Sequence, residues 1–155
     1  MFWTRHKTRP DPSKFDSAIL SQAVKNHLNL KIGVEYWLDG GVMNREKDSG
    51  GELVFYDILF LGHYLFLKMT QTERLRELSA ICKDPLEFNS EGVARKISDR
   101  LWLTMTFAED FNSHLRNLLE VPYIEGLILR KSKSVIDNFG RSQYEASWIK
   151  RCRVK

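Results

Sequence analysis

The cations near the C-terminus are the residues whose number and spacing first suggest a chemistry. Residues 130–155 contain eight Lys and Arg side chains and two acidic ones, which gives this segment a charge of +6, whereas residues 1–129 carry −2 and the whole chain +4. A positive field concentrated in this way suits a polyanion such as a phosphate chain or a nucleic-acid backbone. The alternative is a solvated basic tail without a partner.

Two further segments have residue types that could form a binding site. Phe55 and Tyr56 are consecutive in an apolar run, and the alternation of a strand would put them on opposite faces, so that only one can face a pocket. Glu125 precedes Gly126, whose missing Cβ would let a ligand approach the backbone closely. The alternative for Glu125 is a carboxylate at a strand end that faces water.

Apolar periodicity predicts the elements that must position these residues. Thr70 and Glu73 have the spacing of a capping box, so a helix should begin there. The run Glu52–Leu61 is apolar apart from Asp57 and predicts a buried strand. We expect an α+β fold with mostly antiparallel strands and helices packed on them. Further helices are predicted at 14–29, 90–100 and 109–119, and further strands at 34–43, 101–107, 126–130 and 146–154.

Composition limits the class of protein. A chain of 155 residues with 43% hydrophobic residues is one domain with a core of its own. No run approaches the ~18 apolar residues of a membrane-spanning helix, so we expect no membrane partner. Cys82 and Cys152 form no CxxC pair, and the N-terminus has no apolar signal region. We therefore expect a cytoplasmic protein without disulfides.

Several segments occur in an order that is typical of one family. They are Phe2-Trp3-Thr4-Arg5, Leu38-Asp39-Gly40, Leu53–Leu61 with the Arg74–Leu78 helix, Glu125-Gly126-Leu127, and Gly140-Arg141-Ser142 followed by Trp148-Ile149-Lys150. This series resembles the adenylation (nucleotidyltransferase) domain of ATP-dependent DNA ligases, a family that also includes RNA ligases and mRNA capping enzymes. The resemblance runs from about residue 2 to the C-terminus.

The resemblance implies a fold and a reaction. The fold would be a partial ATP-grasp-like nucleotidyltransferase domain, with antiparallel sheets flanked by helices, and residues 1–155 would form a single incomplete adenylation domain. Such enzymes attach AMP to a lysine, pass it to a 5′-phosphate and then join the nick, in DNA replication, repair and recombination. The implied cofactors are ATP and Mg²⁺, and the implied partner is nicked duplex DNA.

The resemblance also assigns cofactor-binding residues. Tyr56 matches the aromatic residue that stacks on adenine, and Lys150 matches a cation that clamps the α-phosphate. Arg5 would touch the nucleotide or the incoming nucleic acid. Asp39 belongs to a motif of the nucleotide site, and Glu125 would position the metal near the α-phosphate.

Other positions depart from the family pattern or stay open. Arg141 is either a nucleic-acid phosphate contact or part of a loop salt bridge. Cys152 stands where the last motif usually has a second lysine. Arg151 and Arg153 could partly substitute for that lysine as nucleic-acid contacts. The glutamate that usually follows the Asp-Gly pair is replaced by Gly41, which puts catalytic competence in doubt.

The nucleophilic lysine of the family has no counterpart here. It lies in a K-x-D-G motif upstream of the segment matched by Phe2–Arg5, and no K-x-D-G occurs in the chain. We therefore expect no catalytic nucleophile and no self-adenylylation by this chain alone. It would be a fragment that lacks the first motif and the OB-fold domain, half of a split enzyme whose partner chain supplies the lysine, or a catalytically inactive ligase-like module that binds nucleic acid or protein.

Overall fold

The computed structural model describes residues 16–43, 51–62, 64–65, 68–83, 87–88, 94–121, 126–135 and 148–152. These residues form an α+β fold, which confirms the predicted class. The elements are α1 Ser17–His27, β1 Tyr36–Met43, β2 Glu52–Leu61, β3 Tyr64–Leu65, α2 Gln71–Ala80, β4 Glu87–Phe88, β5 Ala94–Ser98, β6 Leu101–Thr104, α3 Phe111–Leu119, β7 Gly126–Arg130 and β8 Trp148–Cys152.

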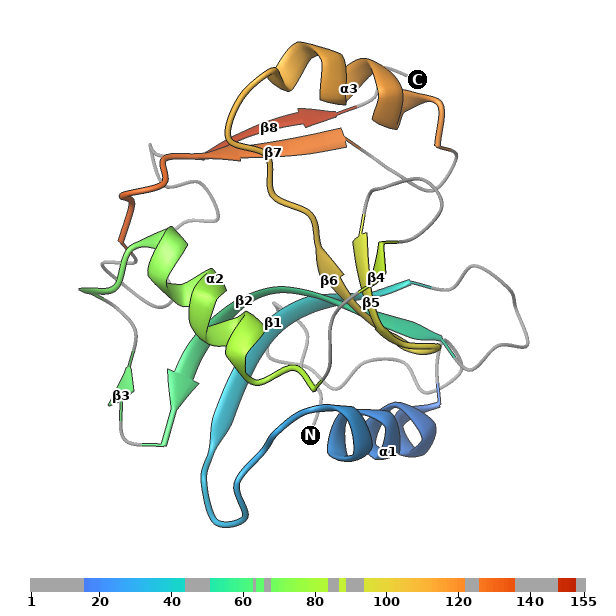
Figure 1. Ribbon diagram of the computed structural model, residues 1–155, viewed down its shortest axis with the longest axis vertical. Helices are drawn as coiled ribbons and strands as arrows, with labels where there is room; N and C mark the ends of the chain where they lie inside the picture. The colour runs from blue at the N-terminus through green and yellow to red at the C-terminus, as the bar shows by residue number, and fades with distance from the viewer. Residues whose placement is uncertain are drawn as a thin grey trace.

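The strands form two sheets. The larger sheet has the order β1-β2-β6-β5-β4, with β3 on the end of β2, and the smaller sheet is the antiparallel pair β7-β8. Every pair is antiparallel except β2 and β6, which run parallel, so the larger sheet is mixed. In Figure 1 the small sheet lies under α3 at one end of the molecule, α1 lies at the other end, and α2 crosses beside β2.

The pairing of β1 with β2 is irregular at its centre. Asp39 lies opposite Asp57, whereas Gly40 lies opposite Phe55, so Tyr56 is an extra residue on β2. A second register shift follows further along the same pair. A β-bulge of this kind redirects the side chains around it and often occurs beside a functional site.

Two apolar clusters lie on opposite faces of this part of the sheet. Phe55 is only 5% exposed and belongs to the cluster that also contains Leu20, Leu28 and Leu78. Tyr56 packs against the other cluster, which includes Trp102. The prediction that strand alternation separates the two neighbouring aromatic residues is therefore confirmed, and Phe55 is a core residue.

The helix starts follow from local capping. Thr70 Oγ1 accepts a hydrogen bond from the Glu73 backbone N–H at 3.3 Å, and Glu73 Oε2 accepts one from the Thr70 N–H at 2.7 Å. The predicted capping box is thus present and fixes the first residue of α2. Asp16 caps α1 in a similar way, since its Oδ1 accepts from the backbone N–H groups of Ala18 and Ile19 at 2.8 and 3.0 Å.

The prediction of a helix at residues 90–100 is wrong. Residues 94–98 form β5, which pairs antiparallel with β6, so that Arg95 lies opposite Leu103 and Lys96 opposite Trp102. Pairing with a buried neighbouring strand outweighs the weak helical pattern of this segment.

In the described part of the chain, no helix is long and apolar enough to cross a membrane.

Candidate functional site

A buried ion pair between β2 and α2 forms the centre of the candidate site. Asp57 and Arg74 are each 1% exposed. The guanidinium of Arg74 donates from Nε to Asp57 Oδ1 at 2.9 Å and from Nη2 to Asp57 Oδ2 at 3.0 Å, a bidentate arrangement. Arg74 reaches the strand because it shares the buried face of α2 with Gln71 and Leu78, three and four residues away.

Arg130 at the end of β7 joins the same pair. Its Nη1 donates to Asp57 Oδ2 at 3.3 Å and to the Gln71 side-chain oxygen at 2.9 Å. The Gln71 oxygen also accepts from Arg74 Nη2 at 2.8 Å. We call Asp57, Gln71, Arg74 and Arg130 the arginine cluster. It links the small sheet to the large one through residues 73 positions apart in the chain.

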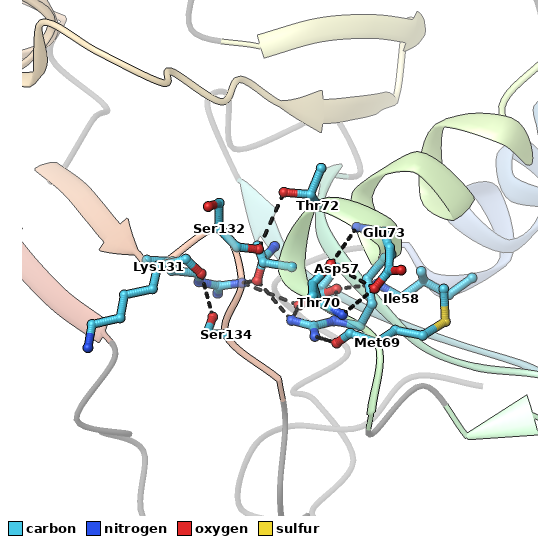
Figure 2. A network of polar contacts seen from close by, with 12 residues as sticks. Asp57, Ile58, Met69, Thr70, Thr72, Glu73, Lys131, Ser132 and Ser134 are labelled. Carbon is cyan, nitrogen blue, oxygen red and sulfur yellow. Dashed lines mark hydrogen bonds and ion pairs between the residues drawn. The ribbon is translucent and has the colours of Figure 1, made fainter.

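Backbone contacts beside the cluster hold the same junction together. The N–H of Gln71 donates to the Ser134 carbonyl oxygen at 2.9 Å, and the Thr72 hydroxyl donates to the Ser132 carbonyl oxygen at 3.3 Å. Figure 2 shows the turn at Lys131–Ser134 lying against the start of α2, next to Asp57. The position of Arg130 is therefore fixed by its own hydrogen bonds and by the turn that follows it.

Asp39 lies at the rim of the cluster. Its position in β1 is directly opposite Asp57, and its side chain is exposed. Although solvent reaches the side chain, the protein atoms around the carboxyl group partly desolvate it and raise its pKa above the ordinary value of 3.8. The positive charge of Arg130 opposes this shift, whereas the negative charge of Asp57 adds to it. Asp39 is thus a carboxylate within electrostatic reach of Arg130.

The two glycines after Asp39 have no room for a side chain. A Cβ at Gly40 would lie 2.6 Å from the Val54 carbonyl oxygen, and a Cβ at Gly41 would lie 2.5 Å from the Tyr56 hydroxyl oxygen. The ring of Tyr56 occupies the space that a side chain at position 41 would need. A side chain at position 41 would therefore require the Tyr56 ring to move.

The small sheet presents different residues on its two faces. Leu127 and Leu129 line a cavity of about 430 Å³ together with residues of α3, including Phe111. The alternate positions are Ile128, which is 52% exposed, and Arg130, which contacts the large sheet. On this second face of β7, Ile128 is thus exposed, whereas the side chain of Arg130 is only 14% exposed.

The predicted site residues are only partly brought together. Asp39 lies opposite Asp57 of the arginine cluster, and the hydroxyl group of Tyr56 lies near Gly41, two residues after Asp39 in β1. Lys150 lies in β8 opposite Ile128, and Arg151 lies opposite Leu127. The remaining predicted residues lie outside the described part of the chain: Arg5, Glu125, Arg141 and Arg153.

The arginine cluster itself was not predicted as a site. The sequence contains one indication of a buried charge, because Asp57 is the single charged residue after Glu52 in the otherwise apolar run of β2. Arg74 belongs to a segment of the resemblance and Arg130 to the basic residues 130–155, but neither position indicates a contact with Asp57 until the fold is known. Among the residues that the structure describes, no group of three or more His, Cys, Asp or Glu side chains could hold a metal ion.

Comparison with known proteins adds no assignment. No protein-family model matches the chain, and no curated protein matches it. The candidate site is thus defined by the geometry of the chain's own residues.

Proposed function

We propose that this chain supplies nucleotide-, metal- and phosphate-binding residues of an ATP-dependent DNA ligase, as part of an ATP-grasp-like adenylation domain. The observation that carries the proposal is a convergence of three segments that the resemblance assigns to one nucleotide site. Asp39 of the first lies opposite Asp57, the residue that follows Tyr56 in the second, and the third continues into β7, whose Arg130 donates to Asp57. These segments are separated by up to about 90 residues in the chain.

The proposed roles follow the resemblance residue by residue. Tyr56 would stack on adenine, and its partial exposure supports this, because the neighbouring Phe55 is buried in the core. Lys150 would contact the α-phosphate and Arg5 the nucleotide or nucleic acid. Mg²⁺ is usually held by one or two carboxylates together with substrate phosphates. Glu125 and the phosphates of ATP would meet that demand.

A second candidate function is a ligase-like module that binds nucleic acid without chemistry. Gly41 favours it, because the missing carboxylate is replaced by the ring of Tyr56 and not by another acid. The +6 charge of residues 130–155 also suits a nucleic-acid backbone, with Arg141, Arg151 and Arg153 as contacts. In the first candidate, by contrast, the nucleophilic lysine comes from a further N-terminal segment or from a partner chain.

Thermal unfolding in the presence of each ligand separates the two candidates. Mg·ATP should raise the midpoint of unfolding if the nucleotide site is intact, because a ligand that binds only the folded state stabilises it. Protection by nicked duplex DNA but not by Mg·ATP would favour the binding module and contradict the ligase proposal. With labelled ATP and Mg²⁺, a denaturing gel should show no protein–AMP band, since the chain has no K-x-D-G lysine.

A further inference from the structure

A short turn after β7 is held in place by hydrogen bonds on both of its sides. Within the turn Lys131–Ser134, the backbone N–H and the hydroxyl of Ser134 donate to the Lys131 carbonyl oxygen at 2.9 and 2.7 Å. Carbonyl oxygens of the turn accept hydrogen bonds from the first residues of α2. Val135, directly after the turn, pairs with Thr70 in an antiparallel bridge. The backbone of this turn is therefore fixed against the start of α2.

The lysines of this region are exposed. Lys131 and Lys133 lie in the turn, and Lys68 lies just before α2. Among the described residues, none of these three lysines takes part in an ion pair. The acids of the adjoining junction are engaged elsewhere, Asp57 in the arginine cluster and Glu73 in the capping box. In Figure 2 the side chain of Lys131 points away from Asp57.

The surroundings of these lysines favour an extended polyanion as the partner. Lysine is a point charge on a flexible stem, so lysines on an open surface suit the successive phosphates of a nucleic-acid backbone. A surface that enters a lipid bilayer also needs exposed apolar side chains. None of the exposed large apolar side chains in the described part of the chain lies in residues 68–72 or 131–135.

We propose that Lys131 and Lys133, together with Lys68, form a contact surface for the sugar–phosphate backbone of duplex DNA. We call these three residues the lysine surface. The inference rests on the nucleic-acid part of the proposed function and adds contacts that the resemblance does not assign. Because the turn is already fixed by α2, DNA has to order only the lysine side chains, which keeps the entropic cost of binding small. Arg130, the residue before the turn, is held in turn by Asp57.

Fluorescence anisotropy with a labelled nicked duplex at several salt concentrations tests this inference. Lys131→Gln/Lys133→Gln should bind at least about tenfold more weakly than wild type at low salt. Its plot of log affinity against log salt should be shallower by about 2, because each phosphate contact contributes about 0.9 to the slope. Lys68→Gln alone should make the slope shallower by about 1. The loss should be the same for two unrelated duplex sequences, since backbone contacts carry no sequence information.

Lys25→Gln/Lys31→Gln is the matched control. It removes the same amount of positive charge from exposed positions, but Lys25 lies in the last turn of α1 and Lys31 in the loop that follows. Figure 1 shows α1 at the opposite end of the molecule from the small sheet that leads into the turn. This control should keep its affinity within about twofold of wild type, because salt screens distant charges. Circular dichroism checks that both double variants are folded.

Four results would overturn the inference. The first is no binding of duplex DNA by wild type at low salt. The second is an equal loss of affinity in the two double variants, and the third is an unchanged salt slope in Lys131→Gln/Lys133→Gln. The fourth is binding of wild type to vesicles that contain phosphatidylserine but not to duplex DNA, which would assign the lysine surface to a membrane.

The same variants separate this inference from the ligase proposal. If Lys131→Gln/Lys133→Gln loses DNA affinity as expected but Mg·ATP does not protect wild type from thermal unfolding, the lysine surface stands and the ligase proposal is wrong. If Mg·ATP protects wild type while the two double variants bind DNA alike, the nucleotide site stands and the inference about the lysine surface is wrong.

Discussion

Replacement of Arg74 by alanine should strongly destabilise the fold. Arg74 is 1% exposed and donates four hydrogen bonds, two of them to Asp57, one to the Gln71 side-chain oxygen at 2.8 Å and one to the Met69 carbonyl oxygen at 2.7 Å. Arg74→Ala leaves these acceptors without that donor in a region closed to water. It also leaves a cavity where the side chain packed.

The expected cost follows from the loss of one partner of a buried ion pair. Such a loss costs about 3–5 kcal/mol, because the other charge stays buried. Arg130 still donates to Asp57 at 3.3 Å, so the lower end, about 3 kcal/mol, is the better expectation. Since a domain unfolds with about 5–15 kcal/mol in total, this change removes a large share of the stability.

Urea unfolding of matched variants measures this cost. Arg76→Ala in the same helix removes an arginine whose side chain is 74% exposed and lies 3.9 Å from Glu77. It should change the free energy of unfolding by no more than about 0.5 kcal/mol. A cost of Arg74→Ala below about 1 kcal/mol, or equal to that of Arg76→Ala, would refute the role of the buried pair. If Arg74→Ala fails to fold, Arg74→Lys allows the same comparison.

Four further predictions follow from other contacts. Gly41→Ala should destabilise the fold by about 1–3 kcal/mol, because its Cβ would meet the Tyr56 hydroxyl oxygen, and Tyr56→Phe should restore part of that loss in urea unfolding. Thr70→Ala should cost about 1 kcal/mol through loss of the cap of α2, also measured by urea unfolding. The pKa of Asp39 is higher in the folded state than in the unfolded state. Asp39 therefore contributes less to stability as the pH rises from the pKa of the unfolded state through the pKa of the folded state. Asp39→Asn should therefore be more stable than wild type at about pH 7 and should lose this advantage at about pH 3, as seen in thermal unfolding at both pH values. Burial raises the pKa of Cys82 to about 11, so peptide mass spectrometry at about pH 8 should show slow alkylation of its thiol in the folded protein and fast alkylation in urea.

Local rules predicted the elements that carry the site. The apolar run of β2 begins and ends where the sequence indicates, and Asp57 inside it marks the place where a buried charge needs a partner. The pair Thr70 and Glu73 predicted the start of α2, because a capping box acts over only three residues. These features depend on neighbours in the chain and can be inferred without the fold.

The site itself depends on contacts between distant residues. The bulge at Tyr56 arises from a shift in the pairing of two strands, and neither strand alone indicates it. Arg130 meets Asp57 only because β7 is placed against α2 by the turn at Ser132 and Ser134. Similarly, residues 94–98 become a strand because β6 lies beside them. Each case is a tertiary effect that overrides or adds to local preference.

The affinity for ATP relative to tripolyphosphate tests the central claim most directly, because the two ligands differ by the nucleoside. The account predicts that wild type binds Mg·ATP about tenfold or more tightly than Mg·tripolyphosphate, since stacking of a base on an aromatic ring is worth about 1–3 kcal/mol. Tyr56→Ala should abolish this difference, and Trp37→Ala, which removes a 48% exposed aromatic side chain from the adjacent strand, should preserve it. Equal affinities for the two ligands in wild type, or an unchanged ratio in Tyr56→Ala, would contradict the proposed nucleotide site.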